Sequence, residues 1–316
     1  MKKILVTGAS GFIGRTLCNN LIESSFNVQG AVRSLDSLTF DYNFKAVTVG
    51  EIGANTNWLN ALKDIDCIIH CAGKAHSINK KDNINMYHSI NTEGTKNLAE
   101  QAVKAGVKRL VFLSSVKVNG ESTGKNFNNK IFTNKSVLDP KDAYSISKFE
   151  SEKSLWKISS KTDLEVVVVR LPLVYGYGAK GNLMRLIKLI KCGIPLPFDL
   201  IKNKRSLIGI DNLVDVLVRC IEHPDAKSKT FLVSDGEDLS TPELLKNIAS
   251  AMGRSAFMFP FPISLLKFFG FVLGKSSEIN RLTRSLQIDN DYTKKILNWS
   301  PPISVQEGIR RMIQNK

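Results

Sequence analysis

A tyrosine and a lysine four residues apart are the side chains in this chain whose types and spacing could do acid–base chemistry. Tyr144 and Lys148 frame the sequence Tyr-Ser-Ile-Ser-Lys. On a helix, residues four apart share one face, so the Lys148 ammonium can lie beside the Tyr144 phenol. A nearby positive charge lowers the pKa of a phenol, which is otherwise near ~10. We therefore expect Tyr144 to exchange a proton with a substrate at neutral pH.

The same spacing also occurs on solvated helix faces, so the pair needs support from the rest of the chain. One support is a hydroxyl at the end of a strand-like segment. The apolar run 109–113 ends in Ser114 and Ser115. From a strand end, Ser115 can hydrogen-bond the carbonyl oxygen that Tyr144 protonates. Ser115, Tyr144 and Lys148 are therefore our candidate catalytic residues.

Three glycines near the N-terminus predict a second site, for the pyrophosphate of a dinucleotide. Gly8, Gly11 and Gly14, with Phe12 and Ile13, directly follow the apolar run Ile-Leu-Val and open a helical pattern. A strand, a glycine turn and a helix N-terminus bind phosphates through backbone N–H groups. The spacing is G-x-x-G-x-x-G rather than the general G-x-G-x-x-G. A dinucleotide site next to a Tyr–Lys pair favours carbonyl chemistry over a solvated helix face.

Further motifs, taken with these, resemble one family over essentially the whole chain. They are HCAGKAH (70–76), NTEGT (91–95), FLSSVKVNG (112–120), RLPLVYGYG (170–178), RSLIGIDNLVD (205–215) and ILNWSPPISVQEGI (296–309). The chain resembles an extended short-chain dehydrogenase/reductase of the nucleotide-sugar epimerase/dehydratase group. This resemblance implies that Ser115 binds the reacting oxygen, Tyr144 transfers its proton and Lys148 holds the nicotinamide ribose.

The resemblance is strongest to enzymes that reduce the C4 keto group of a UDP-4-keto-6-deoxy-N-acetylhexosamine for surface polysaccharides. We take this NAD(P)H-dependent reduction as the main expectation. An NAD-dependent UDP-hexose 4-epimerase is the alternative, and a non-catalytic NADP-binding sensor is a third. Lys117 and Asn119 replace the family's Val-Tyr-Gly ending, which speaks against the epimerase. A 4,6-dehydratase is disfavoured because Val116 and Lys117 stand where those enzymes carry an acid pair.

The choice of cofactor depends on the end of the second predicted strand. NAD sites place a carboxylate there, about 20 residues past the glycine loop, to bind the ribose 2′-hydroxyl. This chain has Arg33 instead. An arginine accommodates a 2′-phosphate, so NADP(H) is favoured and NAD(H) stays possible. The resemblance also implies that Glu51 and Ile52 lie around the adenine.

The resemblance implies contacts to the rest of the cofactor at other strand ends. Ala72 and Gly73 would line the nicotinamide ribose, and Pro172 and Val174 would border the nicotinamide. Asn91 matches an asparagine that holds helix geometry near the lysine. His70 is expected to be a packed, hydrogen-bonded histidine rather than a catalyst.

For the substrate, a UDP-sugar, the resemblance points to arginines in the second half of the chain. Arg205 opens a segment whose arginine contacts the UDP pyrophosphate, where a bidentate guanidinium suits a phosphate. Asn182 is a candidate for the nucleotide or sugar. Arg281 or Arg284 is a candidate for a second phosphate contact.

Alternating strand and helix patterns must position these residues. Apolar strands buried on both faces predict a doubly wound parallel sheet, an α/β Rossmann fold. We expect a Rossmann domain at 1–174 and a mainly substrate-binding lobe at 175–316, with 207–210 and 229–233 returning to the main sheet. The strand patterns are 3–7, 27–32, 45–49, 66–71, 108–114 and 165–170, and the helical ones are 12–24, 56–63, 86–105 and 142–160.

Composition excludes several function classes. The net charge is +15, but the basic residues are spread along the chain without a nucleic-acid-binding signature, so no nucleic acid is expected. Five scattered cysteines lack a C-x-x-C pair, which favours reduced thiols in the cytoplasm and no metal site. The chain opens on a strand rather than a secretory signal.

One stretch is far more apolar than the rest. Residues 257–273 read FMFPFPISLLKFFGFVL, interrupted by prolines and a lysine. The uninterrupted part is shorter than the ~20 residues that span a bilayer, so no transmembrane segment is expected. We expect a buried helix of the second lobe, with a membrane-facing helix as the alternative. The family resemblance also implies a homodimer, formed through helices 86–105 and 142–160.

Overall fold

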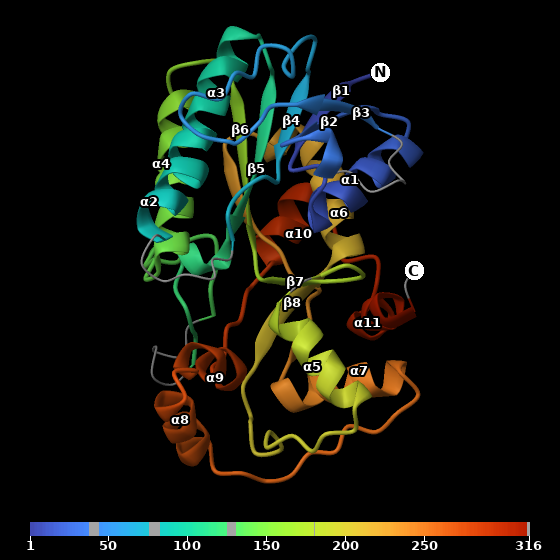
Figure 1. Cartoon of the computed structure of the whole chain (residues 1–316). Helices are drawn as coiled ribbons and strands as arrows, with labels where there is room; N and C mark the ends of the chain where they lie inside the picture. The colour runs from blue at the N-terminus through green and yellow to red at the C-terminus, as the bar shows by residue number, and fades with distance from the viewer. Residues whose placement is uncertain (38–43, 76–82, 125–130, 180, 315–316) are drawn as a thin grey trace.

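A seven-stranded sheet forms the centre of the computed structural model (Figure 1). The structure describes residues 1–37, 44–75, 83–124, 131–179 and 181–314. The strand order is β3-β2-β1-β4-β5-β6-β9, and every pair is parallel. Its strands are Lys3–Thr7 (β1), Asn27–Val32 (β2), Lys45–Thr48 (β3), Cys67–His70 (β4), Arg109–Ser115 (β5), Glu165–Leu171 (β6) and Lys229–Leu232 (β9). The predicted doubly wound Rossmann sheet is confirmed.

Apolar residues on both faces of each strand explain why this sheet is buried. Along β6, Val167 and Val169 enter one core, and Val166 and Val168 enter the core on the opposite face. Successive side chains of a strand point to opposite faces, so a continuous valine run serves two layers of helices.

The two layers of helices cover opposite faces of the sheet (Figure 1). One layer supplies Leu17 and Leu213 to its core, and the other supplies Leu98 and Leu155. The first layer consists of α1 (Phe12–Glu23), α6 (Ile210–Glu222) and α10 (Asp291–Leu297). The second consists of α2 (Asn83–Tyr87), a π-helical turn (His88–Glu93), α3 (Gly94–Lys104) and α4 (Ala143–Ser159).

The helix predicted at 56–63 is wrong, because residues 56–58 have no regular structure and residues 59–63 form turns. Its apolar residues Trp58 and Leu62 are still buried in the core. Side chains of α3 satisfy its backbone: Gln101 accepts from the Trp58 N–H at 2.8 Å and donates to the Thr56 carbonyl at 2.8 Å. Backbone groups paired in this way need no helix to satisfy them.

A second lobe with its own core lies at one end of the main sheet (Figure 1). A three-stranded sheet at its base has the order β10-β8-β7. These strands are Leu173–Tyr175 (β7), Arg205–Gly209 (β8) and Asp238–Leu239 (β10). The helices are α5 (Asn182–Lys191), α7 (Thr241–Ala251), α8 (Ile263–Val272), α9 (Ser276–Thr283) and α11 (Val305–Gln314). Thus β9 returns to the main sheet as predicted, but 207–210 does not, because β8 pairs with β7 instead.

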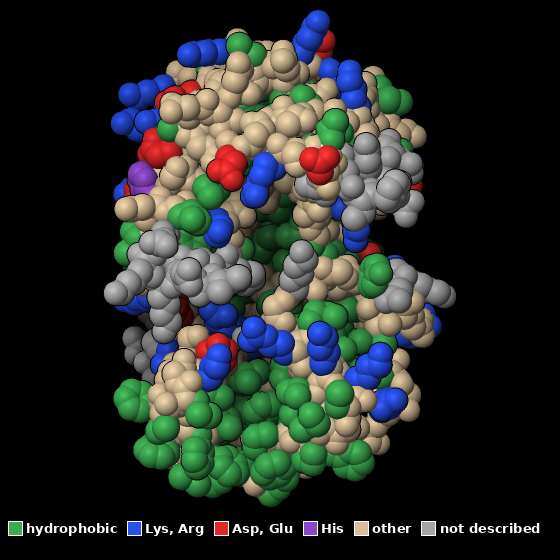
Figure 2. All heavy atoms as spheres, in the orientation of Figure 1, with side chains coloured by type: hydrophobic (Ala, Val, Ile, Leu, Met, Phe, Trp, Pro, Cys, Tyr) green, Lys and Arg blue, Asp and Glu red, His purple; other side chains and the backbone are tan. Residues whose placement is uncertain are grey.

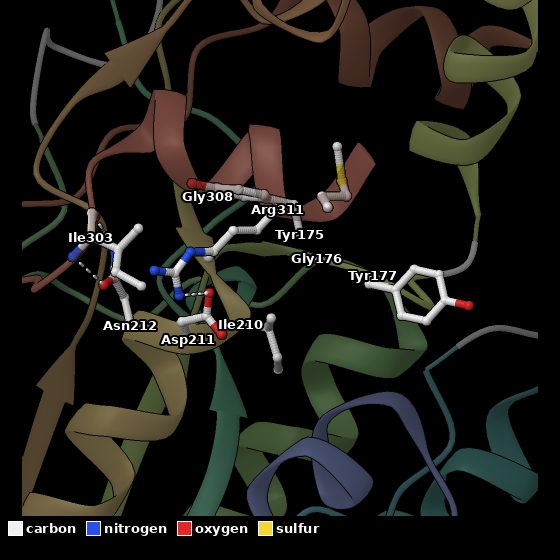
Figure 3. Close-up of a pocket in the computed structure, with 11 residues that line it drawn as sticks. Tyr175, Gly176, Tyr177, Ile210, Asp211, Asn212, Ile303, Gly308 and Arg311 are labelled. Atoms are coloured by element: carbon white, nitrogen blue, oxygen red, sulfur yellow. Dashed lines mark hydrogen bonds and ion pairs between the residues drawn. The ribbon is translucent and has the colours of Figure 1, made fainter. Parts of the chain in front are cut away.

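A polar network joins the two lobes beside the pocket in Figure 3. The Tyr175 hydroxyl donates to Asp235 at 2.7 Å, and the Asn212 amide donates to the same carboxylate at 2.7 Å. Asn212 also donates to the Ile303 carbonyl at 2.8 Å, and Arg311 on α11 pairs with Asp211. The residues of the RSLIGIDNLVD motif therefore hold the C-terminal segment against the junction of the lobes.

The helix in the apolar stretch exists, but its predicted burial is wrong. In α8 only Leu266 and Gly270 are buried, whereas Phe271 is 76% exposed and Phe268 is 58% exposed. The helix lies at the edge of the lobe and packs mainly on α9, so most of its side chains meet no second layer. Within the described residues, no helix combines the length and apolar character needed to cross a bilayer.

Candidate active site

The glycine turn after β1 is shaped by crowding that a side chain would break. Gly8 has φ +67°, and a Cβ there would lie 2.9 Å from the Ala72 Cα. A Cβ on Gly14 would lie 2.2 Å from the Gly8 carbonyl oxygen. Gly11 precedes α1 in extended backbone as its N-cap. The turn therefore places backbone, rather than side chains, in front of the helix N-terminus, as the dinucleotide prediction requires.

The other cofactor-site candidates follow the carboxyl ends of parallel strands and so share one edge of the sheet. Arg33 is exposed after β2, and Ile52 is half-buried after β3 beside an exposed Glu51. Ala72 and Gly73 follow β4, and the buried Pro172 and half-buried Val174 follow β6. This edge borders the hollow that Figure 2 shows between the two lobes.

Ser115 and Tyr144 meet at this edge, from β5 and from the first turn of α4. The Ser115 hydroxyl hydrogen-bonds to the Tyr144 phenol and lowers its pKa, but burial raises it more, to about 12. The negative charge of Asp142 raises the pKa further, and the nearby Tyr87 phenol adds to this increase. Lys148 is not among the groups that lower this pKa, so the expected lowering of the Tyr144 pKa by Lys148 is not found.

Lys148 of α4 is buried, and its side chain is hydrogen-bonded to strand β5. Its ammonium donates to the Leu113 carbonyl at 2.8 Å and lies 4.5 Å from the centre of the Phe112 ring. Burial lowers its pKa to about 8, against the opposing effects of Cys71 and Glu152. An ammonium has three N–H donors, and no other described residue accepts from this one. Donors thus remain for a bound hydroxyl group.

Asn91 stands in the π-helical turn between α2 and α3, facing this lysine. Its amide donates to the Ser147 hydroxyl at 2.9 Å and to the Lys74 carbonyl at 3.0 Å. A Cβ built on Gly73 would lie 3.1 Å from the Asn91 oxygen and 3.3 Å from the Lys148 nitrogen. Gly73 therefore keeps a space open between Asn91 and Lys148. π-Helical turns of this kind occur frequently at functional sites.

A buried ion pair beneath the site was missed from the sequence. Arg170 of β6 and Glu152 of α4 are 4% and 2% exposed, and two hydrogen bonds of 3.0 and 2.5 Å join them. Ser114 also donates to Glu152, and Arg170 donates to Asn119 at 3.2 Å. Glu152 is four residues after Lys148 on the same helix, a spacing that could have pointed to it.

The first turn of α4 is fixed from the other side by Lys117. Asp142 caps the helix by accepting from the Ser145 N–H at 2.7 Å, in a capping box. Lys117 forms an ion pair with Asp142 and lowers the pKa of its carboxyl group. The lysine that replaces a dehydratase acid thus orients the turn that carries Tyr144. Asn119 is buried and accepts a hydrogen bond from Arg170, so its side chain does not face the hollow.

His70 is the packed, hydrogen-bonded histidine that we expected. Its ring nitrogens lie 2.7 Å from the Thr7 hydroxyl and 3.0 Å from the Thr95 hydroxyl. Burial, with Lys148 nearby, lowers its pKa to about 3, so the ring is neutral. Its contacts hold β1, β4 and α3 together. Within the described part of the chain, no three His, Cys, Asp or Glu side chains are grouped as metal ligands.

The arginines expected to bind substrate come together in the second lobe. The Arg205 guanidinium donates to the Arg281 carbonyl at 2.8 Å and to the Arg284 carbonyl at 3.3 Å. Burial and the Arg281 charge lower the Arg205 pKa to about 10. Two positive charges held together favour an anion between them. Asn182 begins α5, but its side chain lies outside the described residues.

A residue missed from the sequence links this cluster to the catalytic candidates. Tyr87 of α2 is buried, and its ring lies edge-on to the Tyr144 ring with centroids 6.0 Å apart. The Arg281 charge lowers the pKa of Tyr87, against burial and Asp142, which raise it. The charge of Arg281 therefore influences Tyr87, which contacts Tyr144. No sequence pattern singles out Tyr87.

Comparison with known proteins identifies the relatives of this arrangement. A sequence model described as "NAD dependent epimerase/dehydratase family" matches residues 4–234. A Vibrio cholerae protein named UDP-glucose 4-epimerase is 43% identical over 321 aligned residues, covering 99% of this chain and 95% of the relative. An Escherichia coli dTDP-4-dehydro-6-deoxyglucose reductase is 23% identical, covering 99% and 96%.

A solved structure has the same fold. The UDP-glucuronic acid 4-epimerase from Bacillus cereus, in complex with NAD, superposes with a TM-score of 0.79. It is 22% identical and covers 99% of this chain, with 97% of its own chain matched. The two-lobe architecture is therefore shared over the full described length.

The buried ion pair gives a test of what positions α4. In Glu152→Ala, Arg170 stays buried without its partner, so the free energy of unfolding should fall by about 3–5 kcal/mol. Glu150→Ala, on the same helix, removes an exposed pair with Lys153 and should change it by less than about 1 kcal/mol. Urea denaturation of both variants measures the difference. Equal effects would show that the pair does not anchor the helix.

Proposed function

The chain belongs to the NAD-dependent epimerase/dehydratase family, and from this premise we propose that it interconverts UDP-hexoses as an NAD-dependent 4-epimerase. The observation that carries the proposal is the 43% identity to a UDP-glucose 4-epimerase over 99% of the chain. This relative favours the alternative of the sequence analysis over the 4-keto sugar reductase that we first expected. The assembled Ser115, Tyr144 and Lys148 support an active enzyme over a non-catalytic sensor.

The residues at the sheet edge fit a nicotinamide dinucleotide. Gly8, Gly11 and Gly14 would receive its pyrophosphate, and Gly73 leaves the space beside Lys148 that a ribose needs. The free donors of Lys148 would hold the ribose hydroxyls. A bound nicotinamide supplies a hydride acceptor and donor for the sugar C4 and, when oxidised, a positive charge.

In the proposed reaction, Tyr144 takes the proton of the sugar 4-hydroxyl as C4 is oxidised, and returns it when C4 is reduced on the other face. Ser115 hydrogen-bonds the same oxygen throughout. The proton and the hydride are both restored, so the net change is inversion at C4. A Tyr144 pKa of about 12 must fall for this step. Positive charge brought in by ligands lowers it, because a nearby positive charge favours the phenolate.

The arginine cluster supplies the binding energy for the nucleotide part of the substrate. Arg205 and Arg281 would bind the UDP diphosphate, because adjacent guanidinium groups match phosphate oxygens. Their position across the hollow from Tyr144 leaves the sugar between the two lobes. Asn182 and Arg284 stay candidates for the nucleotide.

A 4-keto sugar reductase is the second candidate. It is favoured by Asn119, which leaves no tyrosine at the position where many epimerases place one near the sugar. It is also favoured by Arg33, since a reductase exchanges its cofactor and gains from NADPH. The same Ser115, Tyr144 and Lys148 would serve it.

We propose that NAD is the working cofactor, as the family description supports, and that Arg33 lets the site accept NADP. We also propose a homodimer formed through the predicted segments 86–105 and 142–160, which correspond to the layer of α2, α3 and α4. It is supported by the exposed apolar side chains of Ile84, Met86 and Ile146, which lie on this layer of helices (Figure 1).

Turnover without added cofactor separates the two candidate reactions. We expect purified protein to convert UDP-glucose or UDP-N-acetylglucosamine to its 4-epimer, followed by chromatography of the nucleotide sugars. Tyr144→Phe should lower kcat about 10²–10⁴-fold, because the proton acceptor is lost. Tyr292→Phe, whose ring stacks on Phe231 away from the site, serves as the control.

Other outcomes of this assay are decisive too. Stoichiometric oxidation of NADPH by UDP-4-keto-6-deoxy-N-acetylglucosamine, without epimerisation, would establish the reductase. Full activity of Tyr144→Phe would overturn the role of Tyr144 in either reaction.

Arg33→Ala tests the basis of cofactor choice. Loss of a charge-assisted hydrogen bond of roughly 1.5–3 kcal/mol should weaken NADP binding about tenfold or more and leave NAD binding within about twofold. Calorimetric titration measures both. Lys45→Ala, at the opposite end of β3, removes one exposed charge as the control. Unchanged NADP binding would mean that Arg33 does not contact the 2′-phosphate.

Light scattering tests the dimer. The unaltered protein should have the mass of a dimer, twice the chain mass of 35.1 kDa. Ile146→Glu should have the mass of a monomer, because a charge buried in the dimer interface opposes association. A single mass for the unaltered protein would contradict the dimer.

A further inference from the structure

The end of the second lobe carries a cluster of exposed apolar side chains, which we name the apolar tip. Phe271 is 76% exposed, Leu273 is 70% exposed and Phe257 is 63% exposed. Soluble monomers rarely expose large contiguous apolar patches without a function. The apolar tip consists of Ile194, Leu200, Phe257, Phe259, Leu265, Phe268, Phe269, Phe271, Val272 and Leu273.

These side chains form one surface, although they come from separate segments. The Leu196 N–H donates to the Phe257 carbonyl at 2.9 Å, and the Phe259 N–H donates to the Leu196 carbonyl at 3.0 Å. Phe261 bridges to α8, with ring centroids 6.2 Å from Phe259 and 6.3 Å from Phe269. Figure 2 shows hydrophobic side chains gathered over this end of the molecule.

The exposure is held in place by packing on the other side of α8. Leu266 and Gly270 form its buried face. A Cβ on Gly270 would lie 2.6 Å from the Ile279 side chain, so α8 and α9 are in close contact there. The helix is therefore fixed with its aromatic face outward.

Basic residues surround the apolar tip. Figure 2 shows Lys and Arg side chains in a band between the apolar end and the hollow. The exposed basic side chains on the segments that build the tip, or directly beside them, are Lys188, Lys191, Lys202, Lys204, Arg254, Lys267 and Lys275. On the same segments the acidic residues are Asp199 and Glu278. Such a surface is complementary to an apolar layer under negatively charged groups.

We propose that the apolar tip docks on an anionic lipid bilayer, with α8 lying in the interface. Exposed Phe and Leu side chains would enter the boundary of headgroups and acyl chains, and the lysines would contact lipid phosphates. A ten-residue helix is about 15 Å long, half of a ~30 Å hydrocarbon core, so the chain attaches without spanning. This proposal is independent of the reaction catalysed.

Vesicle flotation tests the docking. Vesicles of phosphatidylglycerol and phosphatidylethanolamine should carry the protein to the top of a density gradient, and pure phosphatidylcholine vesicles should carry much less. The triple variant Phe268→Ser, Phe271→Ser, Leu273→Ser should bind at least about tenfold less, because it removes three exposed apolar anchors. Leu59→Ser with Val137→Ser, exposed apolar residues elsewhere, is the control and should float normally.

A charge variant keeps the test independent of the fold of α8. Lys267→Glu with Lys275→Glu leaves every apolar side chain in place and should weaken binding to anionic vesicles by about thirtyfold or more, given ~1 kcal/mol for each of the two basic residues removed. Circular dichroism verifies that both variants fold. Absence of flotation, or equal flotation of the triple variant, overturns the proposal. If the unaltered protein does not float and the triple variant has a smaller mass in solution, the apolar tip instead binds a second copy of this chain.

Discussion

The candidate active site depends on one buried ion pair, between Arg170 and Glu152. It connects the centre of α4 to the end of β6 in a part of the protein that water does not reach. Ser114 of β5 and Asn119 satisfy the remaining polar atoms of the pair. Two charges this deeply buried are stable only when paired and hydrogen-bonded, which allows one position of the helix against the sheet. That position sets where Tyr144 and Lys148 lie.

Burial also shifts the pKa values of Tyr144 and Lys148. Without ligands, burial raises the Tyr144 pKa to about 12 and lowers the Lys148 pKa to about 8. Both shifts disfavour charge in a dry site. Groups poised in this way respond strongly when charged ligands arrive, because a low dielectric strengthens every interaction.

The second lobe adds the positive charges of Arg205 and Arg281, which we propose bind the substrate diphosphate. Arg205 and Arg281 belong to β8 and α9, held to the main domain by the Asp235 network. The same lobe carries the apolar tip at its far end, on the helix that packs against α9. One small domain therefore carries both the arginines that we propose bind the substrate and the surface that we propose docks on an anionic membrane.

The sequence by itself determined the parallel sheet, because runs such as Val166–Val169 are apolar on both faces and can only lie between two layers. It also determined the glycine turn after β1 and the place of Ser115 at the end of β5, since strand ends of a parallel sheet share one edge. Only the tertiary structure decided the pairing of Glu152 with Arg170, the pairing of strand β8 with β7 and the pKa of the Tyr144 phenol. It also decided that α8 is exposed and that 56–63 is not a helix. These features depend on which surface meets which partner, and contacts between distant residues leave no local pattern in the sequence.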